Sequence, residues 1–291
     1  MVKLRKYGSL YLMLLPILIY FSVFTFYPVI RGFIISLQDF RIIGPRPFVG
    51  LDNYLTVLKD PDFFQATLNT LIISGGILIA NFLCSLIIAI LLNELLNNLF
   101  KRFVQTVIYL PHLFSWVVVG GIWIFLLSPD GGLINELVKW FGREPIHFLA
   151  QEEYARPLMI LMAVWKDMGY TCILYLAAIV AINPVLYEAA SIDGANLWQK
   201  IRHIMLPQLI PTMKVVLLLN IMGVLRIFDQ IFIMKNPAIA SQVDVFMTYV
   251  YEKGILQFKM GIASAASFLV LLATFIITLI TRKLIKYDEG V

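Results

Sequence analysis

Residues 188–207 read EAASIDGANLWQKIRHIMLP and form a long polar interruption in an otherwise very apolar chain. Just before this stretch, Asn183 and Pro184 favour a helix start, because asparagine caps a first turn and proline fits within it. Asp193-Gly194 then supplies a break with backbone freedom. The sequence therefore predicts two short helices joined at the glycine.

The second of these helices is predicted to be amphipathic. Its apolar side chains recur at helical spacing, at Leu197, Trp198, Ile201, Ile204 and Met205. Pro207 and Pro211 are expected to end it, because proline lacks the N–H that a helix interior needs. Before and after the break, small side chains such as Ala190 and Ala195 allow another protein to come close. Segment 183–211 is therefore predicted to be a docking surface rather than a linker.

The spacing of this stretch resembles a known loop. Glu188-Ala189-Ala190, then Gly194, then Ile204-Met205-Leu206-Pro207 resemble the cytoplasmic EAA loop of bacterial binding-protein-dependent ABC importer permeases. In that family the loop is the coupling helix that inserts into a cleft of the ATP-hydrolysing subunit. The resemblance implies coupling roles for Glu188, Ala189, Ala190, Asp193, Gly194, Ala195, Ile204, Leu206 and Pro207. The alternative is an amphipathic helix at the membrane surface without a partner.

The composition indicates a polytopic membrane protein. Hydrophobic residues make up 60% of the chain and charged residues only 14%, against about 45–50% and about 25% in soluble domains. Six apolar stretches approach or exceed the roughly 20 residues that cross a bilayer, at about 10–30, 68–92, 103–127, 157–182, 212–234 and 262–280. Backbone groups in lipid must be satisfied within each segment, so each stretch is predicted to be a helix. We expect an all-α fold with a single permease domain over 1–291, and the resemblance implies type I ABC importer architecture.

Basic residues orient the predicted spans. Lys101-Arg102 and Arg282-Lys283 lie directly against span ends, where the positive-inside bias is strongest. Both termini are therefore predicted to be cytoplasmic, which also places 183–211 in the cytoplasm. The first span lacks a small-x-small cleavage site and is expected to be retained. The resemblance implies the bacterial cytoplasmic (inner) membrane, and the net charge of +5 is a topology signal rather than evidence for nucleic acid.

Polar side chains inside the spans are candidates for a solute path, because they are costly in hydrocarbon and usually face a bundle interior or water. Arg226 and Asp229 are three residues apart and are predicted to share one helix face as a charge pair. Aromatic platforms and hydrogen-bonding groups suit a hydroxyl-rich sugar. The candidates are Trp165, Lys166, Tyr170, Arg226, Phe228, Asp229 and Gln230. The alternative, mutual neutralisation of Arg226 with Asp229 or of Lys166 with Asp167, or pairing with a partner subunit, stays open.

Further segments resemble the carbohydrate-uptake branch of these permeases, among them Gly50-Leu51-Asp52-Asn53-Tyr54, Asp60-Pro61-Asp62-Phe63 and Phe228-Asp229-Gln230-Ile231. The resemblance implies a carbohydrate cargo, an oligosaccharide by preference, with a monosaccharide derivative or a polyol phosphate left open. It also implies membrane lipid and three kinds of protein partner. These are a second homologous permease, with a heterodimer favoured over a homodimer, two ATP-binding subunits and an extracytoplasmic solute-binding protein.

Motifs for enzyme chemistry are missing from the sequence. It contains no Gly-x-x-x-x-Gly-Lys-[Ser/Thr] phosphate loop, so ATP and Mg are expected on a partner ATPase, with no cofactor or catalytic residue in this chain. His112, His147 and His203 are far apart, and no metal site is expected. A self-contained secondary transporter is the alternative class. It is less favoured, because only Asp167 and Asp229 are candidate coupling carboxylates and no repeated half is apparent.

Overall fold

The computed structural model describes residues 8–284. In that range the regular secondary structure is helical, apart from an isolated bridge between Gln38 and Phe48. The prediction of an all-α fold is confirmed. The described residues divide into two compact units, one formed by 8–63 with 249–271 and the other by 64–248 with 272–284. The prediction of one permease domain over the whole chain stays a prediction.

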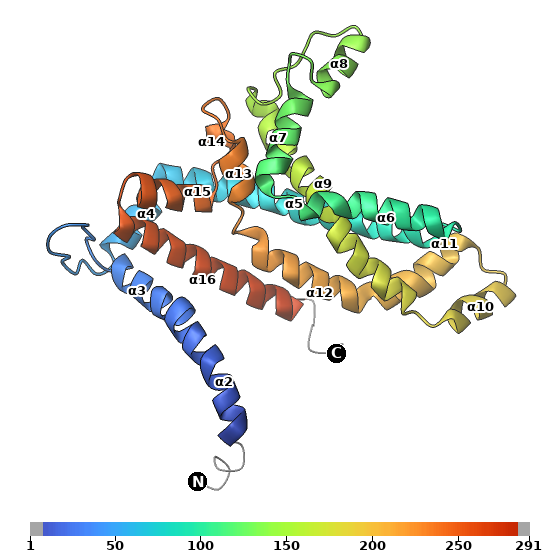
Figure 1. The fold of residues 1–291 in the computed structure, drawn as a ribbon, viewed down its shortest axis with the longest axis horizontal. Helices are drawn as coiled ribbons and strands as arrows, with labels where there is room; N and C mark the ends of the chain where they lie inside the picture. The colour runs from blue at the N-terminus through green and yellow to red at the C-terminus, as the bar shows by residue number, and fades with distance from the viewer. Residues whose placement is uncertain (1–7, 285–291) are drawn as a thin grey trace. The chain divides into compact units, whose positions relative to one another are not determined.

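In the first unit, the first candidate span runs over Tyr11–Ser36, beyond the predicted end at residue 30. It consists of α2 (Gly8–Phe21), a π-helical turn η1 (Ser22–Phe26) and α3 (Tyr27–Ser36), shown in blue in Figure 1. Pro28 lies in the first turn of α3, where a proline is tolerated, so the helix continues through it. Almost all side chains from residue 11 to residue 34 are exposed. Such exposure is expected of a helix that faces lipid or a partner protein.

Helix α4 (Asp52–Lys59) is tied to the end of α3 by side chains. The Asn53 amide donates hydrogen bonds to the Ser36 carbonyl at 2.8 Å and the Gln38 carbonyl at 2.9 Å. The Tyr54 hydroxyl lies 2.7 Å from Ser36 Oγ. The remaining elements of this unit come from the C-terminal part of the chain, namely α15 (Phe246–Tyr251), which begins just before the unit boundary, the π-helical turn η3 (Glu252–Leu256) and the start of α16 (Met260–Leu284).

An ion pair connects the two parts of this unit. Lys253 Nζ lies 2.9 Å from Asp60 Oδ2 and 3.5 Å from Asp62 Oδ2, and the Tyr249 hydroxyl donates to Asp60 Oδ2 at 2.8 Å. Burial alone raises the pKa of the Asp60 carboxyl, but the hydrogen bonds from Lys253, Tyr249 and the Asp62 backbone N–H outweigh it and lower that pKa. Burial alone lowers the pKa of Lys253, whereas Asp60 and Asp62 more than offset this and raise it.

Replacing Lys253 with methionine is expected to destabilise the first unit by about 1–3 kcal/mol, because the partly buried Asp60 carboxylate loses a charged hydrogen-bond partner. The pKa of Asp60 is lower in the folded protein than its ordinary value of 3.8. Asp60 therefore contributes fully to the free energy of unfolding above pH 3.8, and this contribution is lost as the pH falls through the lowered pKa. The pKa of Lys253 is higher in the folded protein than its ordinary value of 10.5. Lys253 therefore contributes fully to the free energy of unfolding below pH 10.5, and this contribution is lost as the pH rises through the raised pKa.

The measurement is the apparent melting temperature of the assembled protein in nanodiscs, for wild type and for Lys253→Met, across pH. The difference in melting temperature between wild type and Lys253→Met should be constant from about pH 5 to 9. It should shrink below the ordinary pKa of Asp60. Lys259→Met, which removes an exposed lysine near the same turn, is the control and should melt like wild type. A constant gap down to the acid limit would show that the ion pair does not stabilise this unit.

The second unit contains most of the helices. They are most of α5 (Pro61–Asn93), α6 (Asn98–Leu113), α7 (Trp116–Leu127), α8 (Leu133–Trp140), α9 (Glu152–Val180), α10 (Pro184–Ile192), α11 (Leu197–Lys200), the π-helical turn η2 (Ile201–Met205), α12 (Leu206–Val224), α13 (Asp229–Met234) and α14 (Ala240–Val243). Over the described residues, five helices are long and apolar enough to span a membrane, or six if the bent pair α6 and α7 counts as one span.

Two predicted spans are interrupted. The third, expected as one helix over 103–127, bends by 106° between α6 and α7. Phe114 and Ser115 are extended there, and the Ser115 hydroxyl accepts a hydrogen bond from the Val118 N–H and caps the new helix. The fifth, expected over 212–234, belongs to a helical segment over Leu197–Gly223, and α13 is a separate short helix. Each of these spans was predicted as one continuous helix, and this was wrong. Apolar composition alone does not indicate where a helix breaks.

The prediction that Pro207 and Pro211 end the amphipathic helix was also wrong. α11, η2 and α12 follow one another without a break, so the helix of the loop continues into the fifth span. Pro207 lies in the first turn of α12, directly after the π-helical turn. A local π turn relieves the missing proline hydrogen bond, which is how such helices accommodate proline.

Two apolar cores hold this unit together. One contains Val119 and Trp123 of α7, Met159 and Met162 of α9, and Ile231 of α13. The other joins α5 and α9 to η2 and α12, with Ile201, Met205 and Leu209 fully or almost fully buried. α9 contributes to both cores, so it is the common support for the sites described next.

Candidate functional site

The segment 183–211 has the two-helix form that its sequence predicts. The Asn183 side chain accepts a hydrogen bond from the Val185 N–H at 3.0 Å and caps α10. At the other end, the Gly194 N–H donates to the Ser191 carbonyl at 3.2 Å and the Ala195 N–H to the Ala190 carbonyl at 2.8 Å. These bonds form a Schellman motif, in which the residue at Gly194 must have a positive φ. Its φ is +77°.

The helix after the break is capped in its turn. Asn196 Oδ1 accepts from the Gln199 N–H at 3.0 Å, and Gln199 Oε1 accepts from the Asn196 N–H at 2.8 Å, so the two residues form a capping box. Across the break, Lys200 Nζ donates to Ser191 Oγ at 2.7 Å and links α11 to α10. The orientation of the two helices is therefore fixed by backbone and side-chain bonds together.

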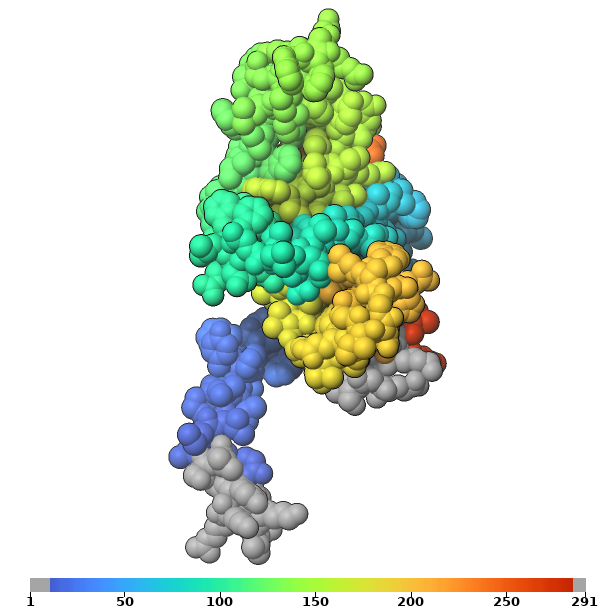
Figure 2. Space-filling model, turned by 90° about the vertical axis from the view of Figure 1, so that its right-hand side faces the viewer, coloured from blue at the N-terminus to red at the C-terminus, as the bar shows by residue number. Residues whose placement is uncertain are grey.

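The surface of segment 183–211 is exposed although several of its side chains are apolar. Ile192 is 88% exposed and Trp198 65% exposed. Ile201 and Met205, by contrast, are buried in the core with α5 and α9, and they anchor the segment to the bundle. Figure 2 shows the segment in yellow and orange on the surface. Exposed apolar side chains on a rigid, anchored element are typical of a protein docking surface.

A hollow of about 330 Å³ lies between the two helices of this segment. Its lining combines small residues, polar groups and both signs of charge, at Ala190, Asp193, Gly194, Ala195, Gln199, Lys200, His203 and Ile204. Of the residues with implied coupling roles, Ala190, Asp193, Gly194, Ala195 and Ile204 line this hollow. Glu188 and Ala189 lie in α10 outside the lining. Pro207 and Leu206 lie beyond it, at the start of α12.

A second group of polar side chains lies at the bend of the third span. Asp167 Oδ1 is 2.9 Å from His112 Nδ1, and the His112 ring stacks on Tyr170 with a centroid distance of 4.7 Å and an interplanar angle of 16°. All three side chains are partly or largely exposed. Asp167 lies near the middle of α9. Charged side chains within a membrane span usually face a polar path or a partner protein.

Lys166 is adjacent in sequence but points to a different environment. It is only 7% exposed, and its ammonium donates to the His112 carbonyl at 2.9 Å. The open alternative, in which Lys166 and Asp167 neutralise each other, does not match these contacts, because each binds a different part of His112.

The other predicted solute residues are dispersed. Trp165 packs edge-on against Trp123 in the core, and Gln230 is buried with its amide donating to the Met159 carbonyl. Phe228 stacks on Phe232. Arg226 lies in the turn after α12 and Asp229 begins α13, so the predicted shared helix face does not exist. The i,i+3 argument failed because the helix ends between them.

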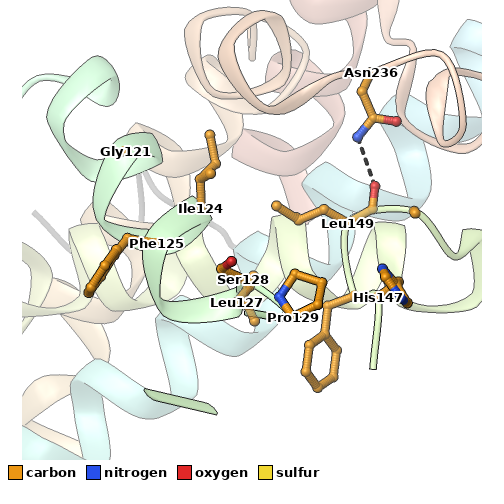
Figure 3. Close-up of a pocket in the computed structure, with 11 residues that line it drawn as sticks. Gly121, Ile124, Phe125, Leu127, Ser128, Pro129, His147, Leu149 and Asn236 are labelled. Atoms are coloured by element: carbon orange, nitrogen blue, oxygen red, sulfur yellow. Dashed lines mark hydrogen bonds between the residues drawn. The ribbon is translucent and has the colours of Figure 1, made fainter. Parts of the chain in front are cut away.

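Two features were missed in the sequence. The three histidines were considered only as metal ligands, although His112 inside an apolar stretch was itself a signal of a polar contact within the span. The second is a hollow of about 570 Å³ beside α7, lined by Gly121, Ile124, Phe125, Leu127, Ser128, Pro129, His147, Phe148, Leu149, Ala150 and Asn236. Figure 3 shows the Asn236 amide reaching the Leu149 carbonyl, a bond of 2.7 Å that holds the loop around this hollow. No sequence pattern marked it.

Comparison with known proteins decides the family. The profile of the family described as "binding-protein-dependent transport system inner membrane component" matches residues 81–286, which include the whole segment 183–211. The chain belongs to this family. It is a transport permease subunit and a multi-pass membrane protein of the ABC importer type.

Curated relatives match this permease along nearly its whole length. It is 39% identical to the polygalacturonan/rhamnogalacturonan transport system permease protein YteP of Bacillus subtilis (strain 168), over 100% of this chain and 92% of that protein. It is 33% identical to the arabinooligosaccharides transport system permease protein AraP of the same strain, over 98% of this chain and 91% of that protein.

Solved structures match it equally well. A bacterial ABC transporter involved in the import of the acidic polysaccharide alginate contains a chain that is 34% identical, with a TM-score of 0.91 and coverage of 98% of this permease and 97% of that chain. A second structure of a bacterial alginate ABC transporter, in complex with an alginate pentasaccharide-bound periplasmic protein, gives a TM-score of 0.90 at 34% identity, covering 97% of this permease and 95% of that chain. The prediction of type I importer architecture is confirmed.

Proposed function

We propose that this permease translocates an oligosaccharide across the bacterial cytoplasmic membrane, driven by ATP hydrolysis on partner subunits. The observation that supports coupling most directly is the exposed, doubly capped helix pair at 183–211, which is anchored in the bundle core by Ile201 and Met205. The relatives YteP and AraP are named as transport permeases for polygalacturonan/rhamnogalacturonan and for arabinooligosaccharides. These names support an oligosaccharide as the cargo.

The proposed topology places both termini and segment 183–211 in the cytoplasm. Lys101 and Arg102 lie near the start of α6, and Arg282 and Lys283 lie in the last turn of α16, each at a span end. Basic residues in these positions favour the cytoplasmic side. The segment then lies where ATP and the ATPase subunits are.

The proposed assembly contains a second, homologous permease, two ATP-binding subunits that carry ATP and Mg, and an extracytoplasmic solute-binding protein. Each ATP-binding subunit contacts one permease through its 183–211 segment. The apolar residues Ile192 and Trp198 supply contact area, and the hollow beside Gly194 receives a side chain of the ATPase. Because α11, η2 and α12 are continuous, a movement of the segment is transmitted directly into the fifth span.

The proposed solute path passes the stacked His112 and Tyr170 rings beside Asp167. Aromatic faces bind the apolar faces of sugar rings, and a carboxylate accepts hydrogen bonds from hydroxyls. Arg226 and Asp229 are exposed and remain candidates for the same path. Lys166, Trp165 and Gln230 are less suited to contact a solute, because each is engaged within the protein.

Reconstitution tests this function. The permease is placed in proteoliposomes with the partner subunits and binding protein of its own host, and uptake of labelled oligosaccharides is measured with ATP, with a non-hydrolysable ATP analogue, and with ion gradients alone. We expect uptake only with hydrolysable ATP. Uptake driven by an ion gradient without ATP would favour a secondary transporter, and uptake of a polyol phosphate but of no oligosaccharide would replace the proposed cargo.

Within the same assay, Tyr170→Leu is expected to weaken apparent solute affinity up to about tenfold, because an aromatic contact is worth about 0.5–1.5 kcal/mol. Tyr170→Phe keeps the ring and should bind almost normally. Tyr11→Leu, on the similarly exposed first span, is the control and should behave as wild type. Loss of the ATP-binding subunits from the purified Tyr170→Leu complex, rather than a change in affinity, would indicate a structural role.

A further inference from the structure

The sharp bend between α6 and α7 leaves backbone carbonyls at the end of α6 without helical partners. The last turn of α6 contains Pro111 and His112, and α7 leaves at 106° instead of continuing the helix. The Phe114 N–H satisfies the Pro111 carbonyl at 3.2 Å, but the His112 carbonyl has no backbone donor among the described bonds. An unsatisfied carbonyl in a membrane span costs several kcal/mol, so the bend needs a donor from elsewhere.

Lys166 of α9 supplies this donor. Its ammonium lies 2.9 Å from the His112 carbonyl oxygen and 3.5 Å from that of Pro111. A cation at the C-terminal end of a helix is also favoured by the helix dipole. The same ammonium lies 5.6 Å from the centre of the Trp116 ring, the first residue of α7. Lys166 therefore contacts the protein on both sides of the bend.

The neighbouring residues of α9 bring Lys166 to this position. Gly169 lets α6 approach closely, because an added Cβ there would collide with the Ile108 carbonyl. Asp167 binds the His112 ring while Lys166 binds the His112 carbonyl, so one residue of α6 is held from two directions. The lysine is almost fully buried, and a buried ammonium persists only where it has such partners.

We propose that Lys166 is a positioning residue that sets the angle between α6 and α7 and does not contact the solute. By fixing the end of α6 it holds the His112 ring against Tyr170, and by its contact with Trp116 it orients α7 and the hollow beside it. This assignment depends on the proposed function only for the location of the solute path. The geometry of the bend itself can be tested without any solute.

The test measures the bend directly. Spin labels are attached to cysteines at Leu99 on α6 and Phe125 on α7, both exposed, in a protein whose Cys84 and Cys172 are replaced by alanine. The distribution of distances between the two labels is recorded by pulsed electron paramagnetic resonance in the assembled transporter in nanodiscs. Lys166→Met keeps the length of the side chain but removes the donor and the charge, and it should broaden the distribution. Lys166→Arg should restore a narrow one, and Lys139→Met on exposed α8 should leave it unchanged.

Transport provides the second readout. For Lys166→Met we expect the maximal uptake rate to fall at least tenfold while the apparent KM stays within about twofold, because the solute contacts are not removed. A raised KM with an unchanged rate and unchanged distances would instead make Lys166 a solute contact and overturn the proposal. If Lys166→Met does not assemble, Trp116→Leu removes only the contact on the α7 side. It should broaden the distribution to a smaller extent, and a distribution identical to wild type would also overturn the proposal.

Discussion

Gly194→Val is expected to reduce ATP-driven uptake to less than a tenth of wild type while leaving membrane insertion intact. Gly194 has a φ of +77° at the end of α10, where the Schellman motif requires a left-handed residue. This left-handed conformation costs an ordinary L residue about 1–2 kcal/mol, and the cost is higher for a β-branched residue. The strain is relieved only if α10 changes its orientation relative to α11, and the docking surface is then lost.

Asparagine makes a matched control for this prediction. An added Cβ at Gly194 would meet nothing within 4 Å, so side-chain size is not the obstacle and the penalty is one of backbone conformation alone. Asparagine tolerates positive φ better than other non-glycine residues. Gly194→Asn should therefore retain most of the uptake, with Gly194→Ala between the two. The amount of ATP-binding subunit that co-purifies should follow the same order, and equal effects of asparagine and valine would contradict the explanation.

The form of segment 183–211 could be predicted because its signals are local. Asn183 and Pro184 begin a helix, Gly194 ends it, and the capping pair Asn196 and Gln199 begins the next. Each depends on residues a few positions apart, so the sequence contains the whole cause. The continuation through Pro207 depends on the π-helical turn before it, and that hydrogen-bond register is not visible in the sequence.

The bend in the third span could not be predicted in the same way. Pro111 and Ser115 were present as signals, but apolar residues continue on both sides, and composition alone favours one helix. What holds the bend is Lys166, more than fifty residues away along the chain. The interpretation of Arg226 and Asp229 failed for a related reason, since helical spacing has meaning only where the helix persists. Long-range contacts therefore decided the part of the candidate site that local patterns left open.

Gly169→Ala is the second substitution with a large expected effect. Its added methyl group would overlap the Ile108 carbonyl and the Tyr109 Cα, both backbone atoms that cannot move aside as a side chain can. Relief requires α6 to shift away from α9, and overpacking of this kind costs about 1–3 kcal/mol or occasionally more. The shift would also draw the His112 carbonyl away from Lys166, so the penalty should be at the upper end of that range.

Gly75→Ala provides the comparison, because an added Cβ at Gly75 in α5 meets nothing within 4 Å. Alanine is favoured over glycine inside a helix by about 1 kcal/mol, so this variant should be neutral or slightly more stable. The two variants are compared by apparent melting temperature and by yield of assembled complex in nanodiscs. We expect Gly169→Ala to melt several degrees below wild type and Gly75→Ala to match it. If both melt alike, α6 and α9 are not packed as closely as Gly169 implies, and the support for the His112 and Lys166 contacts is lost with that packing.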